Sequence, residues 1–371
     1  MTQPLFLAIE LDGEGAHPAA WRAATHPPRD LLDPARRVGI VQEAERAGFH
    51  IATFTDSGSV PGAFPNVTAR IDAVLQAAFA APQTTSIGLV PVVSAAYREP
   101  FHVATQLASL DYASQGRAGW IVRVDPDAAE ARSLGQEPID DPDVLRLDAN
   151  DVVDVSRRLW DSWEDEAVIR DVATGRYLDR SRVHSVDFVG ETFSVAGPSI
   201  VPRPIQGQVV VFGRVGHTDP ALLDVALISG NSVEAIRIGA AEARSAGVPR
   251  VFVDVESALD AAGESAVRRL AALDVHTVRP PTARYRFAGS SSELVDLVKP
   301  LSDVVDGIRF HPTVIDVDLP ELAHLVLPAL RDSGQIVGTT VGATLRETLR
   351  LPAPVNRYAP PASLTQERSR A

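Results

Sequence analysis

The chain has 371 residues, of which 45% are apolar and 22% are charged, with 35 Lys and Arg against 48 Asp and Glu. This length and apolar content support a large core, and we predict a single domain over residues 1–371, because barrels and large α/β sheets reach this size as one unit. The formal net charge of −13 repels phosphate backbones and anionic lipids, which argues against nucleic acid and membrane partners. The absence of Cys excludes disulfides, thiolate metal sites and a cysteine nucleophile.

The N-terminal segment, MTQPLFLAIELDGEG, lacks the basic flank and the long apolar run of a signal peptide. Nowhere does the chain approach the roughly 18 unbroken apolar residues that a membrane-spanning helix needs. We therefore expect a cytoplasmic protein.

Short apolar runs alternate with longer helical patterns from the N-terminus onward. LFLAIEL at 5–11 predicts a buried strand. Asp33 and Pro34 then form an N-cap and a first helical residue before ARRVGIVQEAERAGF, which ends on Gly48. The pattern continues with predicted strands at 50–55, 85–93 and 118–124, and with predicted helices near 66–81, 99–114 and 145–161. This first part therefore contains four βα units.

A polar stretch at 162–208 is too long for a simple connection, so we interpret it as an insertion in which FVGETFSV and PSIVPRPI form a hairpin. Predicted strands resume at 208–213, 225–228, 248–256 and 306–314. Eight buried strands separated by helices favour an α/β fold, a (β/α)8 TIM-like barrel with an insertion after the fourth βα unit. The weak strand at 225–228 leaves an open doubly wound sheet as the alternative. The Pro-rich tail at 352–371 is expected to be ordered only in its first part.

Polar side chains lie at or just after the carboxyl ends of most of the predicted strands, at the end of the barrel where such folds carry their chemistry. They are Asp12, His17, Asp56, Ser94, Tyr97, Asp125, Arg214, His217, Asp254, Glu256 and His311. A ring of this kind suits a ligand pocket, although strand ends are polar in any barrel because they meet solvent. The chain has no Rossmann fingerprint, P-loop, HExxH or GxSxG motif, and we assign no metal site.

Five stretches of the chain carry a family resemblance. They are AWR at 20–22, EAERAGFHIATFTD ending on Asp56, SIGLVPVVSAAYREPFHVATQLASLDYASQGRAGW at 86–120, RLWDSWEDEAVIRD at 158–171 and ATLRETLRLPAPVNRYA at 343–359. Together they resemble the luciferase-like flavin monooxygenases, and most closely the branch of the nitrilotriacetate, pristinamycin and dibenzothiophene-sulfone monooxygenases. The resemblance implies a TIM-like barrel with FMN at the carboxyl ends of the strands. It also implies reduced flavin from a separate reductase, and O2 as co-substrate.

The resemblance also assigns roles to individual residues. Asp56 matches an aspartate beside the flavin ring, and Ser94 falls in the segment that passes under the ring. His17 matches a histidine beside the reaction site, where it would donate or accept a proton. With His311, which lies at the carboxyl end of the eighth strand, it forms our predicted catalytic pair. The alternative roles are a solvated Asp, a turn Ser and a loop His.

The departures from the family pattern concern the flavin contacts. Ile121 stands where the family places an Asn that hydrogen-bonds the flavin, so that contact is lost. Arg146 lies in the region of the family's phosphate-binding His and Tyr. The family's phosphate-binding turn aligns with Gly213, Arg214, Val215 and Gly216. Guanidinium groups bind phosphate well, so we predict Arg146, Gly213, Arg214 and Gly216 as a rebuilt phosphate site, although both arginines could instead form ordinary ion pairs.

Three functions remain open at this stage. The first is an FMN-dependent, two-component monooxygenase that acts on a small organic substrate. The second is a non-catalytic homologue with a degenerate flavin site, which binds a small molecule or a partner. The third is a deazaflavin-dependent oxidoreductase. We also expect a homo-oligomer, because EPFHVATQLASLDYA carries more apolar surface than one helix face buries in its own barrel.

Overall fold

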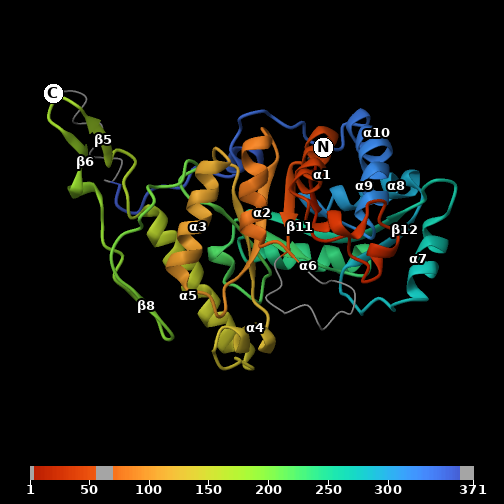
Figure 1. Ribbon diagram of the computed structural model, residues 1–371, viewed down its shortest axis with the longest axis horizontal. Helices are drawn as coiled ribbons and strands as arrows, with labels where there is room; N and C mark the ends of the chain where they lie inside the picture. Colours follow the sequence, from red (N-terminus) through yellow and green to blue (C-terminus); the bar gives the residue numbers. More distant parts are fainter. Residues whose placement is uncertain (1–3, 56–69, 360–371) are drawn as a thin grey trace.

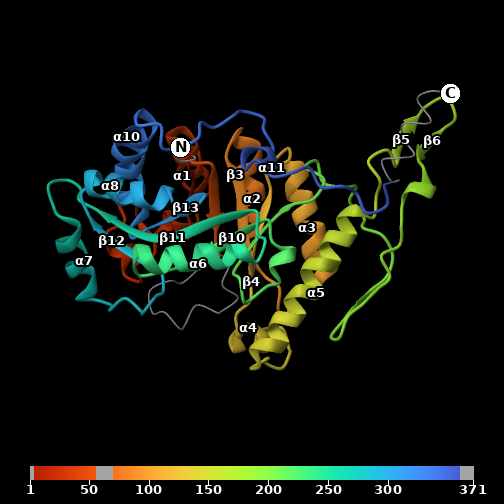
Figure 2. The same cartoon turned by 180° about the vertical axis from the view of Figure 1, so that it is seen from behind.

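The computed structural model describes residues 4–55 and 70–359. Its centre is a closed barrel of parallel strands, in the order β1, β2, β3, β4, β9, β10, β11, β13 and back to β1 (Figures 1 and 2). The strands are β1 (Phe6–Glu10), β2 (Ile51–Phe54), β3 (Gly88–Ser94), β4 (Gly119–Arg123), β9 (Val210–Gly213), β10 (Val225–Ile228), β11 (Arg250–Leu259) and β13 (Gly307–Pro312). Each overlaps one of the eight predicted strands, so the barrel is confirmed and the open sheet was wrong.

A ninth strand, β12 (Tyr285–Gly289), lies outside the closed ring and pairs in parallel with residues 255–259 of β11. β13 occupies one edge of β11 over residues 252–257, so β10 and β12 must share the other edge. β10 pairs with that edge only as far as Val253. The pairing between β10 and β11 therefore ends at Val253, and the two strands separate at their carboxyl ends. The sequence reading did not predict β12.

Helices surround the barrel and connect its strands (Figures 1 and 2). They are α1 (Pro34–Ala47), α2 (Ala73–Ala80), α3 (Pro100–Ala113), α4 (Ala128–Ser133), α5 (Pro142–Asp161), α6 (Val233–Ser245), α7 (Ala266–Asp274), α8 (Ser291–Ser302), α9 (Ile315–Glu321), α10 (Leu327–Asp332) and α11 (Leu345–Thr348), with a π-helical turn at Leu322–Val326. The predicted ends of α1 are confirmed, because the Asp33 side chain accepts from the Ala35 N–H and Gly48 is left-handed with φ 97°. Within residues 4–55 and 70–359, no helix combines the length and the apolar character needed to cross a membrane.

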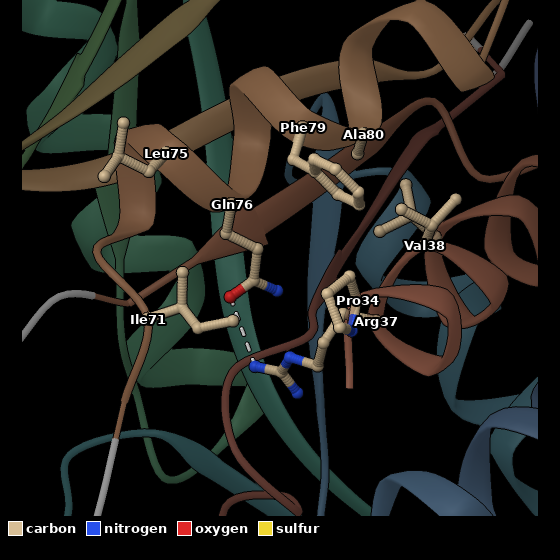
Figure 3. Close-up of a pocket in the computed structure, with 9 residues that line it drawn as sticks. Pro34, Arg37, Val38, Ile71, Leu75, Gln76, Phe79 and Ala80 are labelled. Carbon is tan, nitrogen blue, oxygen red and sulfur yellow. Dashed lines mark hydrogen bonds between the residues drawn. The ribbon is translucent and has the colours of Figure 1, made fainter. Parts of the chain in front are cut away.

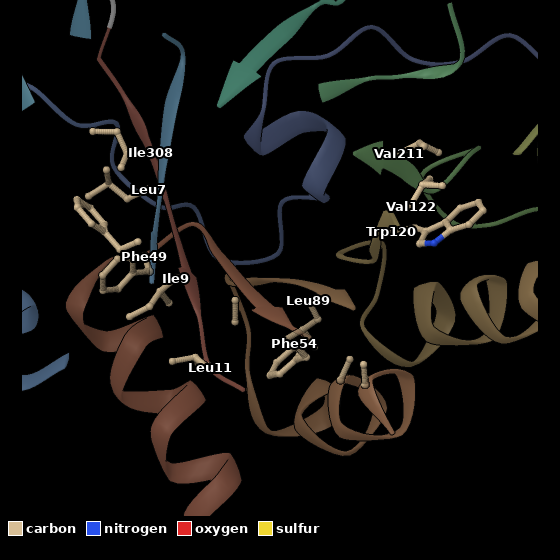
Figure 4. Close-up of a cluster of buried hydrophobic side chains, with 14 of the residues drawn as sticks. Leu7, Ile9, Leu11, Phe49, Phe54, Leu89, Trp120, Val122, Val211 and Ile308 are labelled. Atoms are coloured by element: carbon tan, nitrogen blue, oxygen red, sulfur yellow. The ribbon is translucent and has the colours of Figure 1, made fainter. Parts of the chain in front are cut away.

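Alternate residues of each strand face opposite sides of the barrel wall. The outward residues form the large core between strands and helices, which includes Leu7, Ile9, Trp120 and Ile308 (Figure 4). The inward residues form a second apolar cluster in the amino-terminal half of the barrel, with Phe6, Ala8, Ile51, Val90, Ile121, Phe212 and Phe252 among its members. The barrel interior is therefore a packed core in this half.

α11 closes the amino-terminal end of the barrel. Its Leu345 belongs to the inner cluster and lies against the first residues of β3 and β4. A Cβ atom at Gly88 would lie 2.7 Å from Leu345 Cδ1, and one at Gly119 would lie 3.0 Å from Leu345 Cδ2. Both glycines therefore make room for this plug, and an open end remains only at the carboxyl ends of the strands.

Two small hairpins lie between α5 and β9, and both project away from the barrel (Figures 1 and 2). The first pairs β5 (Val168–Asp171) with β6 (Arg176–Leu178), and the second pairs β7 (Phe188–Val189) with β8 (Ser194–Val195). The predicted pairing of FVGETFSV with PSIVPRPI was wrong, because FVGETFSV supplies both strands of its hairpin. The short loop between Val189 and Ser194 accounts for this.

The part of the tail before residue 360 is fastened to this insertion. Asn356 Nδ2 donates to the carbonyl oxygens of Asp161 and Trp163, at 3.0 and 2.9 Å. The Tyr358 ring stacks on His184 with ring centres 4.0 Å apart. The tail thus holds the base of the insertion against α5.

Candidate functional site

The carboxyl-terminal half of the barrel interior is polar. In β1, Phe6 and Ala8 face inward, so Glu10 does too, and in β13 the outward Ile308 and Phe310 leave Arg309 and His311 facing inward. The same alternation in β11 turns Asp254 inward between the outward Val253 and Val255. Charged side chains from three adjacent strands therefore meet inside the barrel, above the apolar cluster.

Asp254 is the centre of this charged group. Its Oδ1 accepts from Arg309 Nε at 2.7 Å and lies 3.2 Å from His311 Nε2. Its Oδ2 accepts from Arg214 Nη2 at 3.2 Å. The Asp254 side chain is fully buried, and those of Arg309 and His311 nearly so, whereas Arg214 reaches the rim and is 40% exposed. Asp254 thus links the buried interior to the open end of the barrel.

Glu10 is the second carboxylate of the group. It accepts from Thr53 Oγ1 at 2.8 Å and from the Thr55 N–H at 3.0 Å, and it lies 4.0 Å from Arg309 Nη1. Arg309 Nη1 is buried and makes no hydrogen bond to any residue that the structure describes. A buried guanidinium N–H without a partner is costly, so this atom is a candidate ligand contact.

The charges in this group fix its protonation. Burial alone would raise the pKa of Asp254, but the Arg309, His311 and Arg214 groups outweigh burial and hold that pKa well below its ordinary value. Burial and the Arg309 charge lower the pKa of His311, although Asp254 opposes them. His311 is therefore neutral near pH 7. Because Asp254 is an acceptor, the ring proton lies on Nε2, which leaves the lone pair of Nδ1 as a proton acceptor.

The turn that follows β9 has the features of an anion-binding loop. Gly216 has a φ of 91°, and a Cβ at this position would have no atom within 4 Å, so the backbone here is open to a ligand. The N–H groups of His217 and Thr218 both donate to the Arg214 carbonyl, which tightens the turn. Thr218 Oγ1 is buried and has no hydrogen-bond partner in the described part of the chain. The turn thus offers a guanidinium, an unsatisfied hydroxyl and an accessible backbone.

His17 and Ser94 have their polar atoms engaged within the protein. The Ala19 N–H donates to His17 Nδ1 at 3.0 Å, so Nε2 carries the proton and donates to Asp274 Oδ1 at 3.1 Å. Burial lowers the pKa of His17 despite the adjacent Asp274, so this ring too is neutral near pH 7. The Ser94 hydroxyl donates to the Ala96 carbonyl at 3.0 Å. Neither side chain has a free donor, and their predicted roles remain predictions.

Three other predicted cofactor residues are Asp56, Arg146 and Gly213. Asp56 lies outside the described residues. Arg146 lies in the first half of α5, and its Nη2 donates to Asp143 at 3.3 Å. One turn further along α5, Asn150 Oδ1 accepts from the Asp219 N–H at 2.8 Å, so this part of the helix adjoins the end of the Arg214 turn. Gly213 is the last residue of β9, and a Cβ there would lie 2.7 Å from Leu223.

Sequence reasoning missed two residues of the buried group, Glu10 and Arg309. Both lie inside predicted strands, Glu10 in LFLAIEL and Arg309 in DGIRFHPTV. Applying the two-residue period within each strand, instead of reading only the strand ends, would have placed both side chains inside the barrel.

Two further features lie outside the buried charge group. Glu14, His26 and Asp316 have ligand-type atoms within 4.8 Å of one another, but Arg36 donates to Glu14 at 3.1 Å and to Asp316 at 2.7 Å and supplies the positive charge. An apolar cavity of about 230 Å³ lies between α1 and α2 on the outer layer, where Arg37 donates to Gln76 at 3.2 Å (Figure 3). It is lined by Pro34, Arg37, Val38, Val41, Ile71, Leu75, Gln76, Phe79 and Ala80.

A closed (β/α)8 barrel with a polar interior at the carboxyl ends of its strands defines an enzyme-like architecture. The family model for luciferase-like monooxygenases matches residues 14–293. The chain therefore belongs to the luciferase-like monooxygenase family. The predicted family and enzyme class are confirmed.

Individual relatives support the same assignment. The N-acetyl-S-(2-succino)cysteine monooxygenase of Bacillus subtilis (strain 168) is 28% identical over 431 aligned residues, covering 95% of this chain and 98% of that protein. The nitrilotriacetate monooxygenase component A of Aminobacter aminovorans is 33% identical over 219 residues, covering 56% of this chain and 48% of that protein. The solved EDTA monooxygenase of Chelativorans sp. BNC1 has a TM-score of 0.79 at 21% identity, covering 95% of this chain and 99% of that one, and this likeness shows the fold.

Proposed function

We propose that this protein is the oxygenase component of a two-component monooxygenase, which takes reduced FMN from a separate flavin reductase and uses O2 to oxidise a small organic substrate. The turn after β9 carries the proposal. Arg214, the open backbone at Gly216 and the buried unsatisfied hydroxyl of Thr218 belong to one turn of five residues, and a phosphate ester needs donors from several directions. Its relatives with monooxygenase names support the reaction class.

The residues of the site fit FMN best at its phosphate end. Arg214, Thr218 and the backbone near Gly216 would hold the phosphate, with Arg146 as a second guanidinium from α5. At the ring end, the unpartnered Nη1 of Arg309 is the donor that a flavin carbonyl or ring nitrogen would meet. Reduced flavin, when bound, supplies the electrons that activate O2.

The protein's own contribution to the reaction is proton transfer and positioning. His311 holds a proton on Nε2 against Asp254, and its Nδ1 accepts a proton. Asp254 fixes the ring orientation and is itself held ionised by two arginines. His17 and Ser94 would act through shape and position, since their polar atoms are already engaged. The apolar cluster below this layer excludes water from the amino-terminal side.

The test is a titration of the purified chain with FMN, followed by flavin fluorescence quenching, and repeated anaerobically with reduced FMN. Arg214→Ala should weaken FMN binding by roughly 1 to 3 kcal/mol, the scale of a charge-assisted hydrogen bond, and Thr218→Val should weaken it less. Riboflavin, which lacks the phosphate, should bind the wild type and the variants alike. The control is Arg237→Ala on α6, an exposed arginine whose partner is Glu234 at 3.3 Å.

The two alternative functions are outcomes of the same experiment. If the wild type binds neither oxidised nor reduced FMN, the proposed function fails, and a titration with deazaflavin distinguishes a deazaflavin enzyme from a non-catalytic homologue. The apolar Ile121 inside the barrel is the observation that favours the non-catalytic alternative. If FMN binds but Arg214→Ala and Arg146→Ala bind it as tightly as the wild type, the rebuilt phosphate site is wrong.

We further propose that the chain forms a homo-oligomer. The two hairpins between α5 and β9 project from the barrel and expose Val172, Tyr177 and Val189, and Val172 is 94% exposed. Two-stranded hairpins are marginally stable alone. A second copy packed against them would cover these exposed apolar side chains. Light scattering should give at least twice the mass of one 39.6 kDa chain. A monomer mass across a wide concentration range would contradict this.

A further inference from the structure

A pocket of about 200 Å³ lies where β10 and β11 separate at their carboxyl ends. Ser229, which follows β10, and Glu256 of β11 form two of its walls, and the segment leading into β12 forms the third. Four arginines line it: Arg214, Arg279, Arg284 and Arg286. The volume is below the roughly 300 to 1,000 Å³ of sites for drug-sized ligands, so the pocket suits a small molecule or one end of a larger one.

The pocket carries positive charge in a chain whose formal net charge is −13. Its four guanidinium groups have three carboxylate partners. Arg214 pairs with Asp254 and Arg279 pairs with Asp274, while Arg284 and Arg286 share Glu256 at 3.3 and 2.8 Å. Asp254 is also the partner of the buried Arg309, which makes the local excess of positive charge larger. An arginine cluster built only for stability would be expected to have matched carboxylates.

The arginines retain unused hydrogen-bond donors. Arg279 uses Nε and Nη2 on Asp274, and Arg286 uses Nε on Glu256 and Nη2 on the Pro280 carbonyl. The Nη1 groups of both therefore have no partner in the part of the chain that the structure describes. Arg284 Nε is buried and likewise unpartnered. These three side chains are 25 to 35% exposed, so a ligand can reach them.

The pocket wall is held in place before any ligand arrives. Pro280 and Pro281 fix the backbone of the segment, and Arg286 ties the Pro280 carbonyl to β12. The Arg284 N–H donates to Thr282 Oγ1 at 3.2 Å. Rigid, partly neutralised guanidinium forks lose little entropy when they bind an oxyanion.

We propose that this pocket binds a small oxyanion with two or more negative charges, and that it receives the anionic end of the substrate. Two guanidinium forks suit two carboxylate groups or one phosphate dianion. The binding site stands on the pocket alone. Its assignment to the substrate rests on the proposed monooxygenase function, because the pocket opens beside the same end of the barrel as the Arg214 turn.

The experiment is calorimetric titration of the full-length protein at low ionic strength with succinate and with inorganic phosphate, and with neutral succinamide as the uncharged probe. One or both anions should bind, and succinamide should not. Arg279→Gln and Arg284→Gln should each weaken anion binding roughly 10- to 100-fold, the range of a lost charge-assisted contact. The matched control is Arg268→Gln on α7, whose exposed side chain lies 3.9 Å from Glu264 and outside the pocket.

The proposal is overturned if neither anion binds, or if both pocket variants bind as the wild type does. Should either variant unfold, Arg279→Lys, which keeps the charge but loses the fork, replaces it and should still weaken binding. FMN is then titrated into the anion complex. Displacement of the anion by FMN would make this the cofactor's phosphate site and refute a separate substrate site. If the anion binds with these dependences but FMN does not bind at all, the proposed function fails and the anion site stands.

Discussion

The Asp254–Arg309 pair gives the sharpest test of the buried charge group. In Asp254→Asn the side chain keeps its size but loses its charge, and its amide N–H groups face either Arg309 Nε or Arg214 Nη2, both of which are donors. Arg309 then keeps only Glu10, 4.0 Å away, as a counter-charge. Removing one partner of a buried ion pair typically costs about 3 to 5 kcal/mol, and a Coulomb interaction at about 4 Å gives about 4 kcal/mol at an effective dielectric constant near 20. We expect a loss of stability in this range.

The assay is urea unfolding followed by tryptophan fluorescence, since Trp120 and Trp160 are buried in the core. The midpoint should fall while the denaturant slope stays constant. The double variant Asp254→Asn/Arg309→Met should recover part of the loss, because it removes the orphaned cation as well. Asp296→Asn, an exposed helix residue that lies 3.4 Å from Lys299, is the control and should cost less than about 0.5 kcal/mol.

The pH dependence supplies an independent check of the same pair. The pKa of Asp254 in the folded protein lies well below its ordinary value, so its stabilising effect is complete above the unfolded pKa and is lost as pH falls through the folded pKa. The stability difference between wild type and Asp254→Asn should therefore shrink below about pH 4. A cost below about 1 kcal/mol at pH 7, or two single effects that simply add in the double variant, would refute the reasoning.

Two further predictions concern residues outside the barrel interior. Arg117 donates to the carbonyls of Ala81, Thr84 and Ile87 and to Thr84 Oγ1. Arg117→Met should therefore lower the free energy of unfolding by about 3 to 5 kcal/mol and leave FMN affinity unchanged. Weakened FMN binding by the folded variant would contradict this. Burial lowers the pKa of His50 to about 4, so the unfolded chain binds more protons and stability should rise by up to roughly 3 kcal/mol between pH 4 and 6.5. His50→Gln should flatten that slope relative to wild type at each pH, and an unchanged slope would show that His50 does not titrate in this way.

The barrel could be predicted because its signals are local. Each of the eight strands is a short apolar run, and the cap residues Asp33 and Gly48 mark the ends of α1 without help from the rest of the chain. β12 could not be predicted in the same way. Its side chains are only half-buried, and it exists because β11 extends beyond β10 and offers a free edge. That edge is a property of the assembled sheet, and the segment itself shows only the short alternation of Tyr285 and Phe287.

The candidate site was predictable in part. The strand-end positions of Arg214 and His311 predicted that both lie at the carboxyl end of the barrel, because parallel strands all end on one side. The engagement of His17 by Asp274 could not be foreseen, since the two residues meet only when α7 packs against the loop after β1. The same holds for Arg279, Arg284 and Arg286, which converge through the path of one loop and have no distinctive spacing.

Ile121 is the departure from the family that the structure makes most informative. It faces the barrel interior from β4 and is buried against Val92 and Phe212, so the wall offers the flavin ring no hydrogen bond at this position. The buried charge group around Asp254 lies instead on the wall formed by β1, β11 and β13. Under the proposed function, Ile121→Asn would restore a donor and an acceptor at this position.

In the free protein, that Asn is buried without a partner, so the variant should lose about 1 to 3 kcal/mol of stability. If the ring lies against β4, FMN satisfies the new amide, and part of that loss returns as tighter binding by roughly 3- to 10-fold. Quenching titrations of wild type, Ile121→Asn and the size-matched Ile121→Leu measure the effect. Equal FMN affinity in all three would place the ring away from β4, and would leave the unpartnered Nη1 of Arg309 as the polar contact on which flavin binding depends.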